Sequence, residues 1–183
     1  MSEQAEVQVR VQQWIQQCVI GLSLCPFAKV PYQADRVRLS ICAKTQAREI
    51  LTELAVELVN LTRQSDQELE TTLLVLPDAL ADFLDFNDFI GLAESLLEDL
   101  DHHQQFQLAT FHPRYQFADV PADDVGNYTN KAPYPVIQIL RESSVSKVVE
   151  SGDTDAIPGR NIQRMQALGV AQLAQLFPWA ERP

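Results

Sequence analysis

The sequence predicts an α/β (or α+β) fold, a single domain over residues 1–183 with a mainly parallel βαβαβ core. Segments with helical apolar spacing alternate along the chain with short runs that are typical of strands. The 183 residues are 46% hydrophobic and 21% charged, which is enough to bury one core. Only 6 glycines and 3 cysteines occur, which excludes collagen-like and disulfide-based architectures.

Four strands are expected. Residues 37–41 alternate apolar and polar side chains, and residues 71–76 form an apolar run that Pro77 ends, as in a strand buried on both faces. The third and fourth strands are residues 106–111 and 136–140. Helical segments separate the first three strands, so we expect these three to be parallel. The fourth follows a long loop and is expected to be antiparallel.

Helices are expected between these strands and at the end of the chain. Apolar side chains recur at helical spacing over residues 4–20, and Gly21 follows as a natural stop. A second helix is expected after a cap at Thr45, a third over about residues 82–100 and a fourth over 143–150. A last helix is expected from a cap at Asp155 to Gly169, and residues 171–183 form a C-terminal tail.

The formal net charge of −11 argues against binding to nucleic acid or to anionic membranes. Residues 65–110 hold eleven acids and no base, whereas residues 111–141 hold three of each. A small anionic ligand is therefore permitted near residues 111–141. The polar N-terminus, the lack of a long apolar run and the odd number of cysteines predict a cytoplasmic protein with reduced thiols.

The stretch most typical of a binding site is the 24-residue segment 112–135, which has no periodicity but carries four aromatic side chains. Loops of this length in compact domains are usually binding segments or are disordered, and disordered loops are poor in aromatic residues. His112 directly follows the third strand, where open α/β sheets bind ligands. We therefore expect a pocket formed by this segment, His112 and the loop that contains Cys25.

Cys25, His112 and Asp124 are the candidate catalytic residues. In the sharpest hypothesis the Cys25 thiolate is a nucleophile that His112 activates, with Lys29 lowering the pKa of the thiol. The alternatives are a structural histidine, a buried small cysteine, and Asx-type turns for the acidic and amide residues of the loop. Whether the chain is an enzyme stays open.

The candidate substrate-binding residues supply amide, phenol and cationic groups: Asn127, Tyr128, Asn130, Lys131 and Arg141. An arginine at a strand end suits a carboxylate or phosphate, and the alternative is an ion pair with Glu142 or Asp124. A metal site of His112 with Asp123 or Asp124 is a weaker variant, because it lacks the usual second histidine or cysteine, and no metal ligands are assigned. No phosphate-loop or dinucleotide motif indicates a cofactor, and nothing indicates an oligomeric state.

A different function class is a protein-interaction module. Residues 82–89 mix acids with three phenylalanines and lie in the acidic segment, so they can present an acidic, aromatic surface to a basic partner. The favoured alternative places Phe83, Phe86 and Phe89 in the core and leaves the acids solvated.

Six motifs resemble the bacterial domain-of-unknown-function family 1415 over about residues 10–170: LCPFAK (24–29), ETTLL (70–74), DFLDFNDF (82–89), FHPRYQF (111–117), DDVGNYTNKAPYP (123–135) and LRE (140–142). The resemblance implies a single cytoplasmic domain with signature positions at Cys25, His112 and 127–135, and it implies no activity or cofactor. Lys131 replaces the family's usual arginine, and Gln138 replaces a frequent histidine. A metal pair of residues 112 and 138 is therefore not available to this chain.

Overall fold

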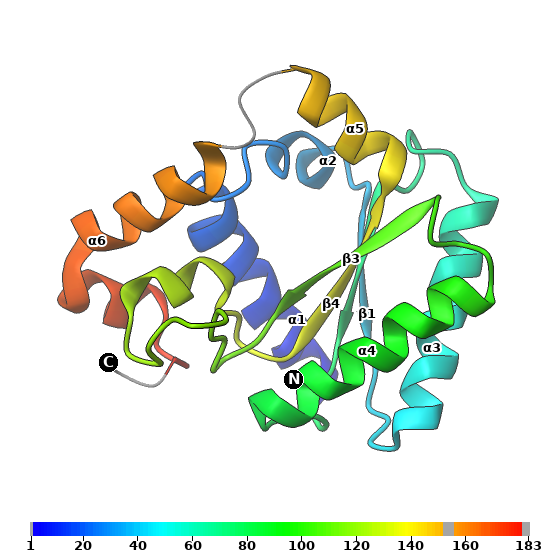
Figure 1. The fold of residues 1–183 in the computed structure, drawn as a ribbon, viewed down its shortest axis with the longest axis horizontal. Coiled ribbons are helices and arrows are strands. Elements are labelled where there is room, and N and C mark those ends of the chain that lie inside the picture. The colour runs from blue at the N-terminus through cyan, green and yellow to red at the C-terminus, as the bar shows by residue number, and fades with distance from the viewer. Residues whose placement is uncertain (1, 152–155, 181–183) are drawn as a thin grey trace.

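The computed structural model describes residues 2–151 and 156–180. Figure 1 shows an α/β arrangement built around one sheet. The elements are α1 (Glu3–Trp14), η1 (Ile15–Ile20), α2 (Lys29–Gln33), β1 (Val37–Ile41), α3 (Ala47–Arg63), β2 (Thr71–Val75), α4 (Phe83–Asp99), β3 (Phe106–Phe111), η2 (Val125–Asn130), β4 (Val136–Arg141), α5 (Glu142–Ser151) and α6 (Ala156–Leu176). The expected cap at Asp155 lies outside the described residues.

The four strands form one mixed sheet in the order β1-β2-β4-β3. β1 is parallel to β2, and β4 is antiparallel to both β2 and β3, so the first three strands share one direction. The predicted fold class and the antiparallel fourth strand are confirmed. Because β4 lies between β2 and β3, the only parallel neighbours among the strands of the described residues are β1 and β2.

The apolar sequence of β4 explains its central place. Val136, Ile137 and Ile139 are fully buried and face both sides of the sheet, whereas most residues of β3 are only partly buried. A strand that is apolar on both faces gains most burial between two neighbours with helices above and below it.

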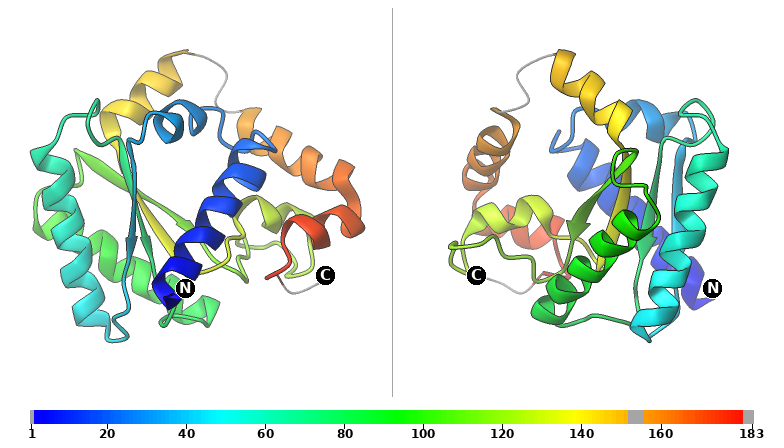
Figure 2. Two further views of the ribbon diagram at one scale, coloured as in Figure 1. Left: turned by 180° about the vertical axis from the view of Figure 1, so that it is seen from behind. Right: turned by 45° about the vertical axis from the view of Figure 1, so that its right-hand side comes forward.

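Helices cover both faces of the sheet. Leu74 and Leu76 pack with α3 and α4 on one face, and Leu73 and Val75 pack with α1, η1 and α6 on the other. In Figure 2 the sheet separates α3 and α4 from α1 and α6. No helix in the described parts of the chain is long and apolar enough to cross a membrane.

The expected N-terminal helix is present, but its last six residues form the π-helix η1. Gly21 follows, and a Cβ atom there would collide with the carbonyl oxygen of Gln17. Because glycine has no Cβ atom, the backbone at residue 21 can lie close to the carbonyl group of Gln17. π-helical turns are rare and often lie beside functional sites, and this one leads into the loop that contains Cys25.

Candidate functional site

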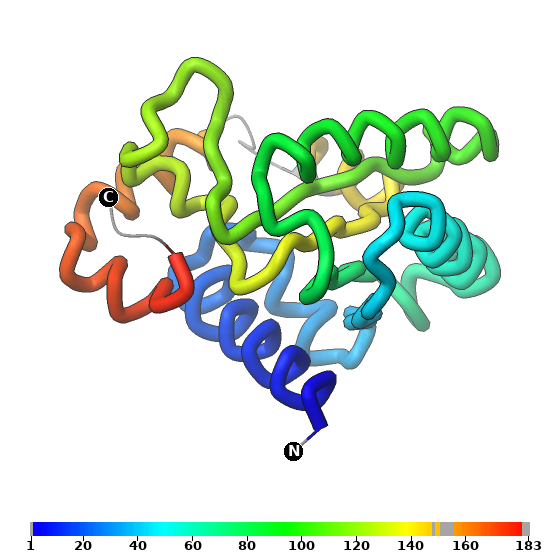
Figure 3. Tube along the Cα trace, turned by 90° about the horizontal axis from the view of Figure 1, so that it is seen from below, coloured from blue at the N-terminus to red at the C-terminus, as the bar shows by residue number. Residues whose placement is uncertain are grey.

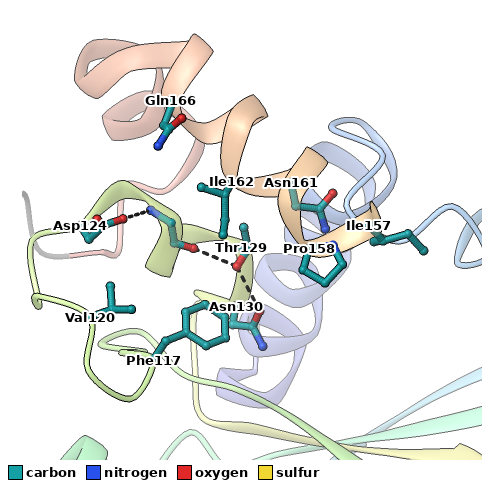
Figure 4. A pocket seen from close by; sticks show the side chains of 11 residues that line it. Phe117, Val120, Asp124, Thr129, Asn130, Ile157, Pro158, Asn161, Ile162 and Gln166 are labelled. Carbon is teal, nitrogen blue, oxygen red and sulfur yellow. Dashed lines mark hydrogen bonds between the residues drawn. The ribbon is translucent and has the colours of Figure 1, made fainter. Parts of the chain in front are cut away.

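Segment 112–135 leaves the end of β3, forms η2 and returns to β4. Figure 3 shows it running beside α6, and η2 packs directly against that helix. Between them lies a cavity of about 500 Å³, drawn in Figure 4. Its lining residues come from the segment and from the N-terminal half of α6: Phe117, Val120, Asp124, Gly126, Thr129, Asn130, Ile157, Pro158, Asn161, Ile162 and Gln166.

Asp124 begins η2 as its N-cap. Its Oδ1 accepts a hydrogen bond of 2.6 Å from the backbone N–H of Gly126. A Cβ atom at Gly126 would lie 2.9 Å from that oxygen and 3.5 Å from Cγ1 of Ile162. Glycine at this position therefore leaves room both for the carboxylate and for the cavity.

Asn127 is fully buried, and its amide organises the loop before η2. Its Oδ1 accepts from the backbone N–H of Phe117 at 3.1 Å, and its Nδ2 donates to the carbonyl of Pro121 at 2.8 Å. Because both ends of its amide are bonded to the protein, Asn127 supports one wall of the cavity and does not line it.

Asn130 lines the cavity and ties η2 to the end of β3. Its Nδ2 donates to the carbonyl of Thr110 at 3.2 Å, and its Oδ1 lies 3.2 Å from the hydroxyl of Thr129. The backbone N–H of His112 donates to the Asn130 carbonyl, also at 3.2 Å. These bonds hold the segment in place without a ligand.

Tyr128 and Lys131 turn toward the core instead of the cavity. The Tyr128 ring packs edge-on against Phe177, with centroids 5.2 Å apart, and burial raises the pKa of its hydroxyl. Lys131 is only 5% exposed, and its Nζ lies 4.1 Å from the centre of the Tyr128 ring. A cation over an aromatic face stabilises this packing, so both residues attach η2 to the chain that follows α6.

His112 is completely buried, and both of its ring nitrogens are engaged. Nδ1 accepts from the backbone N–H of Arg114 at 3.0 Å, and Nε2 lies 3.0 Å from the carbonyl of Leu80. This pairing requires the neutral tautomer with the proton on Nε2. Burial lowers the pKa of the ring, which packs against Phe83 and Phe86. The geometry is that of a residue joining the end of β3 to the start of α4.

Cys25 lies in the loop after η1, and the residue as a whole is exposed to solvent, although its sulfur atom is partly desolvated. Desolvation of the sulfur raises its pKa, and backbone hydrogen bonds from Phe27 and Ala28 act in the opposite direction. The raised pKa favours the thiol over a thiolate at neutral pH. Because both ring nitrogens of His112 are bonded elsewhere, no hydrogen bond joins Cys25 to His112 in the described structure.

The loop of Cys25 instead contacts α6. The Asn161 amide donates to the carbonyl of Leu24 at 2.8 Å, and the Arg164 guanidinium donates to the carbonyl of Leu22 at 2.7 Å. The loop therefore supports the α6 wall of the cavity.

Arg141 lies at the opposite end of the sheet from His112, because it pairs with Phe106 at the start of β3. Its guanidinium donates to the carbonyls of Leu61, Gln64 and Leu69 at 2.8 to 3.1 Å. Arg141, a candidate substrate-binding residue, therefore lies away from His112 and from segment 112–135. The reason is that an antiparallel strand ends where its neighbours begin. The Arg141 side chain instead caps carbonyl groups at the C-terminal end of α3.

The aromatic rings of residues 82–89 belong to the core. Phe86 and Phe89 are 1% and 3% exposed, and Phe83 is partly buried beside Tyr115, with ring centroids 5.3 Å apart. The core interpretation of this motif is confirmed, and the acids of α4 remain on the surface.

Sequence reasoning missed the α6 wall of the cavity. Residues 156–168 were expected to form a helix with an apolar core face, and nothing in their spacing pairs Asn161 or Ile162 with Asp124 some forty positions earlier. Across residues 2–151 and 156–180, no three His, Cys, Asp or Glu side chains are grouped so as to hold a metal ion.

Comparison with known protein families gives a match over most of the chain. A family model described as "Protein of unknown function (DUF1415)" matches residues 6–175. No curated protein and no solved structure matches the chain. Since the matched region covers most of the 183 residues, the resemblance predicted from the motifs is confirmed, and the chain belongs to the DUF1415 family.

Proposed function

We propose that this protein binds a small organic molecule in the cavity between segment 112–135 and α6. The observation that carries the proposal is the cavity itself. Its volume of about 500 Å³ lies within the range of roughly 300 to 1,000 Å³ that is typical of small-molecule sites. Such sites combine apolar walls with a few polar groups that orient the ligand.

The lining has this composition. The apolar side chains are Phe117, Val120, Ile157, Pro158 and Ile162, and the polar side chains are Asp124, Thr129, Asn130, Asn161 and Gln166. Internal hydrogen bonds already fix the polar groups from Thr129 and Asn130. A wall that is ordered before binding lowers the entropy lost when the ligand enters.

The lining also changes the expected charge of the ligand. None of its described residues is a lysine, arginine or histidine. Lys131 packs on Tyr128, and Arg141 is bonded to carbonyls at the other end of the sheet. We therefore replace the anionic ligand expected from the sequence by an uncharged or cationic one. The proposal is binding and includes no catalytic step through Cys25 or His112, and the cytoplasmic location remains a prediction.

A thermal-shift screen with a chemically diverse panel of metabolites tests the proposal. The wild type is compared with Ile162→Trp, which fills the cavity, and with Val170→Trp, which places the same ring on an exposed part of α6 outside the lining. A ligand at about 100 times its Kd stabilises a protein by about 2.7 kcal/mol, or about 5 to 10 °C for a chain of this size.

The proposal predicts at least one compound that stabilises the wild type and Val170→Trp but not Ile162→Trp. Two results contradict it: no compound stabilises the wild type, or every stabilising compound acts equally on all three proteins.

A further inference from the structure

Several hydrogen-bond donors of the cavity's polar side chains are directed at the protein. The Thr129 hydroxyl donates to the carbonyl of Gly126 at 2.9 Å, Asn130 Nδ2 donates to Thr110, and Asn161 Nδ2 donates to Leu24. The side-chain oxygens of these residues keep lone pairs that can accept further hydrogen bonds. The lining therefore offers acceptor oxygens to a ligand, beside the second N–H group of each of these amides.

Asp124 adds a full negative charge to this set of acceptors. One of its oxygens binds the N–H of Gly126, and a carboxylate has about four lone-pair sites in all, so it can accept from a ligand as well. Figure 4 shows Asp124 and Thr129 on the η2 side of the cavity, with Ile162 and Asn161 coming from α6. A ligand that fills the cavity meets the carboxylate at one side and apolar carbon atoms across it.

The charge of the lining favours the same kind of ligand. The acidic excess of the chain lies in residues 65–110, but the described lining itself contributes a carboxylate and no cationic side chain. A negative field attracts cations and repels anions, and it raises the local concentration of a cationic ligand.

We propose that the ligand is a small amine that binds in its protonated form, with the ammonium group on Asp124 and the neighbouring acceptors and with its apolar body against Phe117, Ile157 and Ile162. This inference rests on the proposed function and names the class of its ligand. An ammonium group is a donor with no acceptor, so it complements a lining of this kind, whereas a carboxylate or phosphate would face Asp124 directly.

The test is isothermal titration calorimetry at pH 7 with three probes of matched size: phenethylamine, phenethyl alcohol and phenylacetate. The amine is protonated at this pH. We expect it to bind up to about fivefold more tightly than the alcohol, since a partly solvated ion pair contributes up to about that factor. Phenylacetate is expected to bind most weakly.

Two variants assign the effect to one carboxylate. Asp124→Asn keeps an oxygen that accepts from the N–H of Gly126, so the cap of η2 is preserved. It is expected to weaken phenethylamine about fivefold and to leave phenethyl alcohol unchanged. Asp123→Asn makes the same change in net charge at an exposed neighbour outside the lining and is expected to leave the affinity for all three probes within about twofold of the wild type.

The outcomes separate the two proposals. The amine assignment is overturned if the alcohol binds as tightly as the amine, if the two Asp→Asn variants weaken the amine equally, or if only other compounds bind in the cavity. In each case the proposed function stands as long as Ile162→Trp abolishes the binding. If neither these probes nor the wider panel binds in a way that Ile162→Trp abolishes, the proposed function fails together with the assignment.

Discussion

The Asn161 side chain donates a 2.8 Å hydrogen bond to the backbone carbonyl of Leu24, two residues that are 137 positions apart in the sequence. The bond fixes the N-terminal half of α6 to the loop that follows η1, and the same half-helix, Asn161 included, lines the cavity together with η2. The shape of the proposed site therefore depends on a contact outside segment 112–135.

Asn161→Ala is expected to loosen the α6 wall. Loss of one hydrogen bond costs about 1 kcal/mol of unfolding free energy, and the amides of residues 157–166 should exchange with solvent faster than in the wild type. Hydrogen-exchange mass spectrometry measures this change, with Asn87→Ala on the exposed face of α4 as control. Unchanged exchange in α6 would show that the bond does not hold the wall.

Asn127→Ala is expected to disorder the loop before η2 and to weaken ligand binding without any contact to the ligand. The variant leaves the N–H of Phe117 and the carbonyl of Pro121 without their partner. We expect a loss of about 1 to 3 kcal/mol in unfolding free energy, measured by urea denaturation, and faster exchange over residues 117–124. A fully stable variant with wild-type affinity for the ligand contradicts this role.

His112 should make stability depend on pH. Burial lowers its pKa in the folded state, whereas in the unfolded chain a histidine titrates near 6.5. Protonation therefore favours the unfolded state, and stability is lost as the pH falls from about 6.5 toward the lower folded pKa. Urea denaturation between pH 7.5 and 5 should show a smaller decrease for His112→Gln than for the wild type. Equal decreases in both proteins would contradict the buried neutral ring.

Arg141 is expected to contribute to stability and not to ligand binding. Its guanidinium bonds three carbonyls, and hydrogen bonds to a charged group contribute about 1.5 to 3 kcal/mol each before solvent screening of the partly exposed parts. Arg141→Met should lower the unfolding free energy by about 2 kcal/mol or more, while Arg63→Met, at an exposed position of α3, should change it little. A selective loss of ligand affinity in Arg141→Met would contradict this and would show that Arg141 takes part in ligand binding.

The secondary structure was predictable from the sequence because its signals are local. Helical spacing and short apolar runs located α3, α4 and all four strands, and the long loop before β4 indicated its antiparallel direction. The position of β4 between β2 and β3 was not predicted, because strand order depends on which strand gains most from burial on both faces. The π-helical end of α1 was missed too, since apolar spacing does not distinguish it from an α-helix.

The site was only partly predictable for a related reason. Asp124 and Asn130 line the cavity, but Asn127, Tyr128 and Lys131 on the same short stretch turn into the protein. Residue type shows that a side chain can bind a ligand, and only the fold shows whether the protein itself already uses it. The α6 wall had no sequence signal, because its pairing with η2 is a long-range contact.

The most direct test of a binding site between η2 and α6 is NMR titration of the isotopically labelled protein with phenethylamine and phenethyl alcohol, read at the backbone amides. Such a site predicts saturable shifts at Gly126, Thr129 and Ile162 that are absent in Ile162→Trp and retained in Val170→Trp. Shifts confined to the acidic surface of α4, or no saturable shift with any compound of the panel, would contradict a binding site between η2 and α6.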